Sequence, residues 1–126
     1  MDDSAQIKQV FKAALLTALA DGKPQVEEVK IIHGLVALHP AFGQLPDAKQ
    51  LLIDTWKELK ADGMDACLSR VTAGVTGREY QELAFRTCAR VMAADGTTEG
   101  EEAMVLGELQ EAFGFSPADV KRLLAE

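Results

Sequence analysis

Apolar residues recur along this chain at the three- and four-residue intervals of an amphipathic α-helix. The first stripe runs from Ile7 to Ala18 and ends at an Asp21-Gly22 turn, where the glycine can take the left-handed conformation of a helix C-terminus. Pro24 suits the first turn of a second helix, which ends before Pro40. No stretch alternates apolar and polar residues as a β-strand would.

Five further helices are predicted in the remaining sequence. Pro46 opens the first of them, and a short helical piece covers residues 65–73. Thr76-Gly77-Arg78-Glu79 has the form of a capping box, in which the Thr and Glu side chains accept backbone N–H groups at the start of a helix. Two more helices begin near residue 98 and at Ser116-Pro117. We therefore predict an all-α fold of about seven helices.

Composition places the chain among globular proteins. It has 126 residues, 48% of them apolar, which suits one domain with a buried core and excludes a disordered segment. The 13 Lys and Arg against 20 Asp and Glu give a net charge of −7, which disfavours nucleic acids and anionic membrane surfaces as partners. Cys67 and Cys88 are expected to be reduced core residues. The acidic N-terminus and the lack of a long apolar stretch favour a cytoplasmic protein without membrane insertion.

A sequence repeat relates residues 5–39 to residues 79–113. A shift of 74 residues places Asp21-Gly22 on Asp95-Gly96 and Glu27-Glu28 on Glu101-Glu102. The motif Ala-Asp-Gly, then four residues, then Glu-Glu therefore occurs twice, each time between two helices with apolar stripes. We expect two helical hairpins related by an approximate internal two-fold axis, within a single domain over residues 1–126.

The acidic residues of the repeat continue the apolar stripes. Glu28 and Glu102 precede apolar positions by three, four and seven residues, and Asp21 and Asp95 follow mostly apolar positions at the same intervals. Four carboxylates are therefore expected to meet at the rim of the core. Two charges about 5 Å apart repel by roughly 3 kcal/mol at an effective dielectric of 20. A bound cation, protonation or N–H groups of the next helix must offset this repulsion.

The spacing of the Asp, Gly and Glu matches part of an EF-hand calcium loop, but two of the loop's carboxylate positions are occupied by residues without carboxylates. A standard EF-hand is therefore excluded. The remaining hypothesis is that the two half-sites together bind one Ca²⁺, Mg²⁺ or Mn²⁺. The four expected ligands are Asp21, Glu28, Asp95 and Glu102. Glu27 and Glu101 are secondary candidates, for which helix capping is the favoured interpretation. No motif predicts an organic cofactor or a catalytic nucleophile, so we do not expect an enzyme.

The doubled hairpin resembles the TerB-like domain of tellurite-resistance proteins over nearly the whole chain. That family has an Asp-Gly turn with a Glu seven residues beyond the Asp, as in Asp21 with Glu28 and in Asp95 with Glu102. The segment Phe113-Gly114-Phe115-Ser116-Pro117 is similar to the family's connection to its final helix. The resemblance is strongest in the second half of the chain.

The resemblance implies an all-helical bacterial cytoplasmic domain whose acidic residues bind a divalent metal. It also implies a role in assemblies linked to tellurite resistance and wider stress responses. Tellurite itself is not an expected ligand, because an oxyanion matches poorly with an acidic cluster in a chain of charge −7. In the first half, Lys23-Pro24 replaces the usual acidic turn residues, and the connection from Pro40 to Pro46 is longer.

Three functions are compatible with the sequence. The leading hypothesis is a non-enzymatic module that binds a divalent cation and docks on an unidentified protein partner. The second is a purely structural interaction domain, whose acids are helix caps and whose exposed apolar groove recognises a helix or peptide. A metal-dependent hydrolase ranks last, because the sequence offers no general base beyond the acids themselves.

Overall fold

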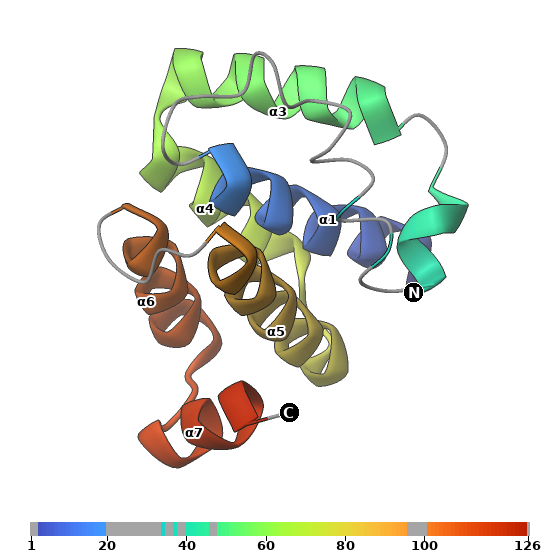
Figure 1. Cartoon of the computed structure of the whole chain (residues 1–126). Helices are drawn as coiled ribbons and strands as arrows, with labels where there is room; N and C mark the ends of the chain where they lie inside the picture. Colours follow the sequence, from blue (N-terminus) through green and yellow to red (C-terminus); the bar gives the residue numbers. More distant parts are fainter. Residues whose placement is uncertain are drawn as a thin grey trace.

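All the secondary structure that the computed structural model describes is helical. The described residues are 3–19, 34, 37, 40–45, 48–95 and 101–125, with side chains at 3, 4, 92–95 and 101–103 left undescribed. Figure 1 shows the elements: α1 (Asp3–Leu19), the 3-10 helix η1 (Pro40–Gln44), α3 (Ala48–Asp62), α4 (Met64–Gly74), α5 (Arg78–Asp95), α6 (Glu101–Phe113) and α7 (Pro117–Ala125). The predicted all-α fold is confirmed over this part of the chain. Of the helix predicted after Pro24, only residues 34 and 37 are described, and both are helical.

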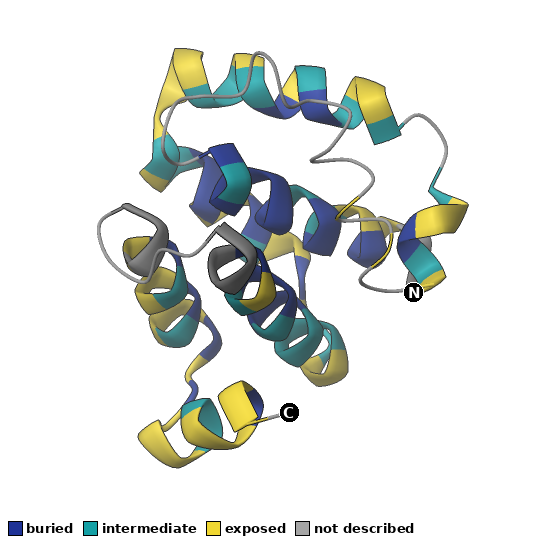
Figure 2. Cartoon of the chain, viewed as in Figure 1, coloured by how far each residue is buried: buried dark blue, intermediate teal, exposed yellow. Residues whose placement is uncertain are grey.

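Helix α1 lies at the centre of the molecule and contacts α3, α4, α5, α6 and η1. In Figure 2 it is buried along most of its length, whereas the helices around it are buried mainly on one side. The amphipathic stripe predicted for this helix therefore understates its burial, because neighbouring helices cover it on several sides. Its buried residues lie all around the helix axis: Gln6, Ile7, Val10, Phe11, Ala13, Ala14, Leu15, Leu16, Thr17 and Leu19.

The start of α5 is fixed to α1 by a glutamine side chain. Gln6 is 3% exposed, and its Oε1 accepts the backbone N–H groups of Thr76 at 3.0 Å and Gly77 at 2.8 Å. The Gly77 carbonyl accepts the N–H of Gln81 at 2.9 Å, so Gly77 is the residue that precedes the first turn. Helix α5 thus begins one residue later than the predicted capping box at Thr76 requires. The oxygen that accepts the N–H groups of Thr76 and Gly77 belongs to Gln6 of α1.

Charged residues connect α1 to α3 and α3 to α4. Lys12 Nζ lies 3.2 Å from Glu58 Oε1, and the lysine side chain is only 15% exposed. Arg70 Nη1 lies 2.7 Å from Asp62 Oδ2 and 3.8 Å from Glu58 Oε2. The less exposed Lys12 pair sits next to the core, where it fixes how α3 lies on α1. None of the helices, as far as they are described, has the length and apolar character to cross a membrane.

Candidate functional site

The predicted metal-binding acids fall at the ends of helices. Asp95 is the last residue of α5, and Glu101 and Glu102 are the first two residues of α6. The side chains of these three acids are among those that the structure leaves undescribed. The other three predicted acids lie outside the described residues: Asp21, Glu27 and Glu28.

The helix faces that lead to Asp95 and Glu102 are buried. Residues four and seven positions before Asp95 are at most 7% exposed, and residues three and seven positions after Glu102 are fully buried. These residues are Val91, Cys88, Val105 and Leu109. Since positions three, four and seven apart share a helix face, the backbone register places positions 95 and 102 on the core-facing sides of their helices. The predicted apolar stripes of α5 and α6 are confirmed for these residues, and their continuation by the two acids stays a prediction.

Three helix ends lie at the same end of the molecule. In Figure 1 the C-terminal end of α1, the C-terminal end of α5 and the N-terminal end of α6 are close to one another. Contacts of α1 with both α5 and α6, and of α5 with α6, agree with this view. Among the side chains that the structure describes, no group of three or more His, Cys, Asp or Glu could hold a metal ion. That the predicted acids meet in one pocket stays a prediction.

The Phe113–Pro117 segment is a tight joint between α6 and α7. Gly114 has φ +70°, and its N–H donates to the Glu111 carbonyl at 3.3 Å. The N–H of Phe115 donates to the Gln110 carbonyl at 3.0 Å, which completes the hydrogen-bond pattern of a Schellman motif. The Phe115 ring then packs edge-on against Phe85 of α5, with ring centroids 5.5 Å apart. The motif thus directs α7 back onto α5.

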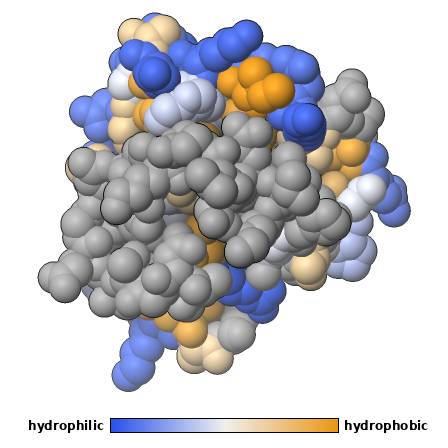
Figure 3. All heavy atoms as spheres, turned by 45° about the horizontal axis from the view of Figure 1, so that its top comes forward, coloured by the Kyte–Doolittle hydropathy of each residue, from blue (hydrophilic) through white to orange (hydrophobic). Residues whose placement is uncertain are grey.

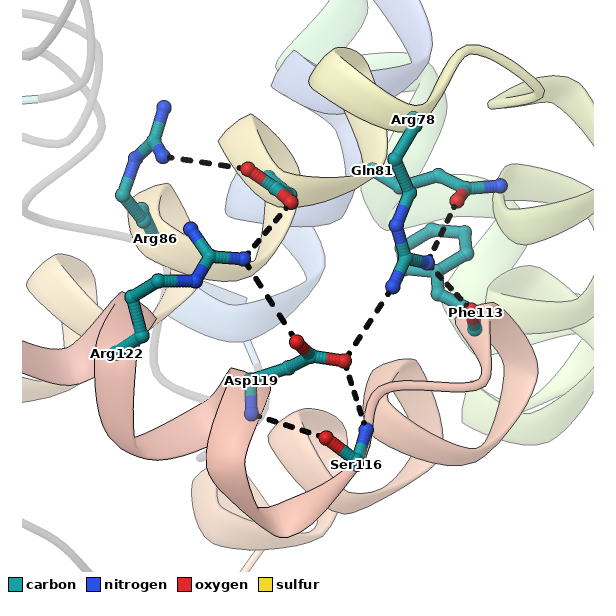
Figure 4. A network of polar contacts seen from close by, with 8 residues as sticks. Arg78, Gln81, Arg86, Phe113, Ser116, Asp119 and Arg122 are labelled. Atoms are coloured by element: carbon teal, nitrogen blue, oxygen red, sulfur yellow. Dashed lines mark hydrogen bonds and ion pairs between the residues drawn. The ribbon is translucent and has the colours of Figure 1, made fainter.

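Arg78, the first residue of α5, holds this joint from the other side, as Figure 4 shows. Its Nη1 donates to the Phe113 carbonyl at 2.8 Å, at the C-terminal end of α6, where a cation is favourable. Its Cζ lies 4.4 Å from the centroid of the Phe115 ring. Its Nη2 lies 3.5 Å from Asp119 Oδ2 in α7. One guanidinium therefore contacts the end of α6, the connection and the start of α7.

The start of α7 is a reciprocal cap. Ser116 Oγ accepts the Asp119 N–H, and Asp119 Oδ2 accepts the Ser116 N–H, both at 3.1 Å. The backbone hydrogen bond from Ser116, followed by its hydroxyl and by the two nearby arginines, holds the pKa of Asp119 below its ordinary value. Arg122 Nη2 donates to Glu82 Oε2 of α5 at 3.0 Å. The predicted cap at Ser116, with Pro117 in the first turn, is confirmed.

Both cysteines are buried and reduced, as predicted. Burial raises the pKa of the Cys88 thiol to about 12, although a hydrogen bond with Thr17 lowers it in part. Burial also raises the pKa of Cys67, and Glu58 adds to this shift. Both thiols stay protonated at neutral pH, so neither is an activated nucleophile.

The residues that sequence analysis missed are those that act between distant segments. Arg78, Glu82 and Arg122 join α5 to α7, and Gln6 joins α1 to α5. Local signals were carried by the spacing of Glu82 and Arg86, four apart in α5, and by that of Asp119 and Arg122, three apart in α7.

Comparison with known proteins identifies one family. Residues 8–125 match the family model described as tellurite resistance protein TerB. This range includes both Asp-Gly turns and the Phe113–Pro117 joint. Searches of curated proteins and of solved structures found no match.

Proposed function

This chain belongs to the TerB family of tellurite resistance proteins, and we propose that it is a cytoplasmic, non-enzymatic domain that binds one divalent cation. The cation is Ca²⁺, Mg²⁺ or Mn²⁺, and no organic cofactor takes part. The domain contacts a protein partner in a tellurite-resistance or stress-response assembly. The proposed ligands are Asp21, Glu28, Asp95 and Glu102, with Glu27 and Glu101 as secondary candidates.

The observation that carries this proposal is the burial of the helix faces on which two of the ligands lie. Val91, one turn before Asp95, is 7% exposed, and Val105, three residues after Glu102, is fully buried. An acid at the edge of a core is less hydrated than an acid on the outer surface, so its charge interacts more strongly with nearby charges. Asp95 also lies at a helix C-terminus, where the helix dipole disfavours an anion. A bound cation offsets both effects.

Thermal unfolding of the metal-free protein tests the proposal. Each of Ca²⁺, Mg²⁺ and Mn²⁺ is added in turn, and the melting temperature is followed by circular dichroism. A cation present at a hundred times its dissociation constant stabilises the folded state by about 2.7 kcal/mol. For a chain of this length the melting temperature then rises by roughly 10 °C. Asp95→Asn combined with Glu102→Gln should abolish the rise.

The matched control is Glu108→Gln with Glu111→Gln, which removes the same charge from exposed positions of α6, the helix that also carries Glu102. This control should keep the metal-dependent rise. Unchanged melting with all three metals would contradict cation binding, and an equal loss in both double variants would contradict the assigned ligands.

The second candidate is a purely structural interaction domain in which the acids only cap helices. Asp119 favours it, because this acid bonds the backbone N–H of Ser116 at the start of α7. Under this alternative, the Asp95→Asn/Glu102→Gln variant unfolds at a lower temperature in the absence of metal, and added metal does not change the difference. The same titration therefore separates the two functions.

A further inference from the structure

We propose that copies of this chain associate head to tail, with a basic stripe on α3 of one copy against an acidic stripe on α6 of the next. The basic stripe consists of Lys49, Ile53, Trp56, Lys57 and Lys60. The acidic stripe consists of Met104, Gly107, Glu108 and Glu111. Neither stripe contains a proposed metal ligand, so this inference goes beyond the proposed cation binding.

The basic stripe lies on one face of α3, because each of its residues is three or four positions from another member of the stripe. Lys49, Lys57 and Lys60 are exposed, while Ile53 and Trp56 are half-buried. Lys60 Nζ lies 5.4 Å from the centroid of the Trp56 ring. Within the described part of the chain, neither Lys49 nor Lys57 has an ion-pair partner. A positive surface with an indole at its centre is thus open to an approaching molecule.

The acids of α3 differ from the lysines of the basic stripe in that they contact other residues of the same chain. Glu58 pairs with Lys12 of α1, Asp62 pairs with Arg70 of α4, and Asp54 accepts a hydrogen bond from Gln50 at 2.9 Å. These acids occupy the opposite flank of the helix from the basic stripe. Charge on α3 is therefore separated into an acidic flank with partners inside the molecule and a basic flank whose lysines have no ion-pair partner among the described residues.

The acidic stripe has the complementary character. Met104, Gly107, Glu108 and Glu111 are all exposed, and Met104 is 43% exposed, one of the two large apolar side chains with high exposure among the described residues. Within those residues, Glu108 and Glu111 form no ion pair. A Cβ added at Gly107 would meet no atom within 4 Å, so the backbone of α6 is open to close approach at this point.

The two stripes match in charge and in apolar content. Lysines of the first can pair with the glutamates of the second, while the Met104 thioether suits contact with an indole ring. In Figure 1, α3 runs along the top of the molecule and α6 lies below it at the left, so the two stripes are on helices that lie apart within one chain. In Figure 3 the hydrophobic residues of the visible described surface form small areas among hydrophilic ones, so polar contacts must contribute to any docking on this face.

A second copy is the occupant that the surface charges favour. The chain carries a net charge of −7, so most of its surface repels another copy, and the basic stripe is the place where an acidic helix is attracted. Two different surfaces in contact form a heterologous interface, which builds a ring or an open row instead of a two-fold dimer. One helix face against another buries less than a standard interface, so the association is weak and reversible.

Sedimentation velocity on the full chain tests the association. With rising protein concentration at physiological salt, the average mass should rise above the monomer mass of 13.6 kDa. Lys57→Glu with Lys60→Glu should remain a monomer, and so should Glu108→Lys with Glu111→Lys. In an equimolar mixture, the reversed, acidic α3 stripe of the first variant can meet the reversed, basic α6 stripe of the second, and the two unchanged stripes can also meet. The mixture should therefore associate again.

The charge control is Lys8→Glu with Lys121→Glu, which makes the same change in net charge as Lys57→Glu with Lys60→Glu, but at exposed positions outside both stripes. It should associate as the unchanged chain does. Gly107→Gln is a steric test that leaves the charge unaltered, and it should block association while the monomer stays folded. A constant monomer mass at all concentrations would overturn the proposal, and so would a mixture of the two charge-reversed variants that stays monomeric. Binding of the monomer to anionic vesicles through the same lysines would also overturn it.

Metal-dependent melting is measured separately from mass, so a failure of self-association can be told apart from a failure of cation binding.

Discussion

Two buried threonines in neighbouring helices differ in whether their hydroxyl groups are satisfied. Thr17 of α1 is fully buried, and its Oγ1 donates to the Ala13 carbonyl at 3.0 Å. Thr55 of α3 is 1% exposed, and its Oγ1 has no hydrogen-bond partner among the residues that the structure describes. A buried hydroxyl without a partner lowers stability by about 1–3 kcal/mol relative to a satisfied one. Thr55 is therefore a position, within the described part of the chain, at which a buried polar atom lowers the stability of the fold.

Replacing that hydroxyl by a methyl group should stabilise the protein. Thr55→Val keeps the shape of the side chain and removes the unpaired oxygen, so we expect the free energy of unfolding to rise by about 1 kcal/mol in urea denaturation. Thr17→Val is the matched control, in which the same change breaks a hydrogen bond and should lower stability. A loss of stability in both variants would show that the Thr55 hydroxyl is satisfied in solution.

At the scale of elements, α6 contains Gly107 and is followed directly by Gly114, and the two glycines have different backbone conformations. Gly114 ends the helix with φ +70°, a conformation that other residues rarely adopt. Gly107 lies inside the same helix at an exposed position, and its added Cβ would meet open space. The Arg78 contacts to the Phe113 carbonyl and to Asp119 depend on the turn at Gly114, because it sets the direction of α7.

The two glycines should respond to alanine with opposite signs. Gly114→Ala strains the left-handed turn and should lower the free energy of unfolding by about 1–2 kcal/mol. Gly107→Ala should raise it by up to about 1 kcal/mol, since alanine is the better helix former at an ordinary helical position. Chemical denaturation of both variants measures the two changes in the free energy of unfolding. Equal effects of the same sign would contradict the assignment of the Schellman turn.

Sequence patterns predicted the elements better than the contacts between them. Helical periodicity found the helices, and local chemistry found the cap at Ser116, because its partner Asp119 is three residues away. The Gln6 contact to Gly77 spans 71 positions in the chain, and the Arg78 contact to Phe113 spans 35, so neither leaves a local pattern.

For the candidate site, periodicity predicted the buried faces next to two of the acids, through Val91 and Val105. Whether both repeats contribute to one pocket is a question of packing between distant segments, which periodicity within one helix does not address. The shared pocket therefore stays a prediction.

At the scale of the whole molecule, the central position of α1 couples the other helices. It contacts α3 on one side and α5 and α6 on others, and Leu15 in its middle is fully buried. Trp56 of α3 is the single tryptophan of the chain and packs partly against the core. Its fluorescence therefore reports on α3 and the core beside it, while circular dichroism reports on all helices.

Leu15→Ala should destabilise α3 and the other helices together. We expect a loss of about 3 kcal/mol from the removed side chain and the cavity it leaves. The transitions followed by Trp56 fluorescence and by circular dichroism should still coincide. Leu124→Ala is the control, because this leucine is 54% exposed and its truncation should change stability by less than about 0.5 kcal/mol. Separate transitions by the two probes would show that α3 unfolds independently of the rest.

The burial of α1 by helices that come much later in the chain has a consequence during synthesis on the ribosome. Helix α1 ends at Leu19, but α5, one of the helices that cover it, ends only at Asp95. At about 5–20 residues per second, the ribosome needs roughly 4 to 15 s to make the chain between these two points. Until α5 follows α1 out of the exit tunnel, a delay of the same order, the buried apolar side chains of α1 have only some of the helices that will enclose them.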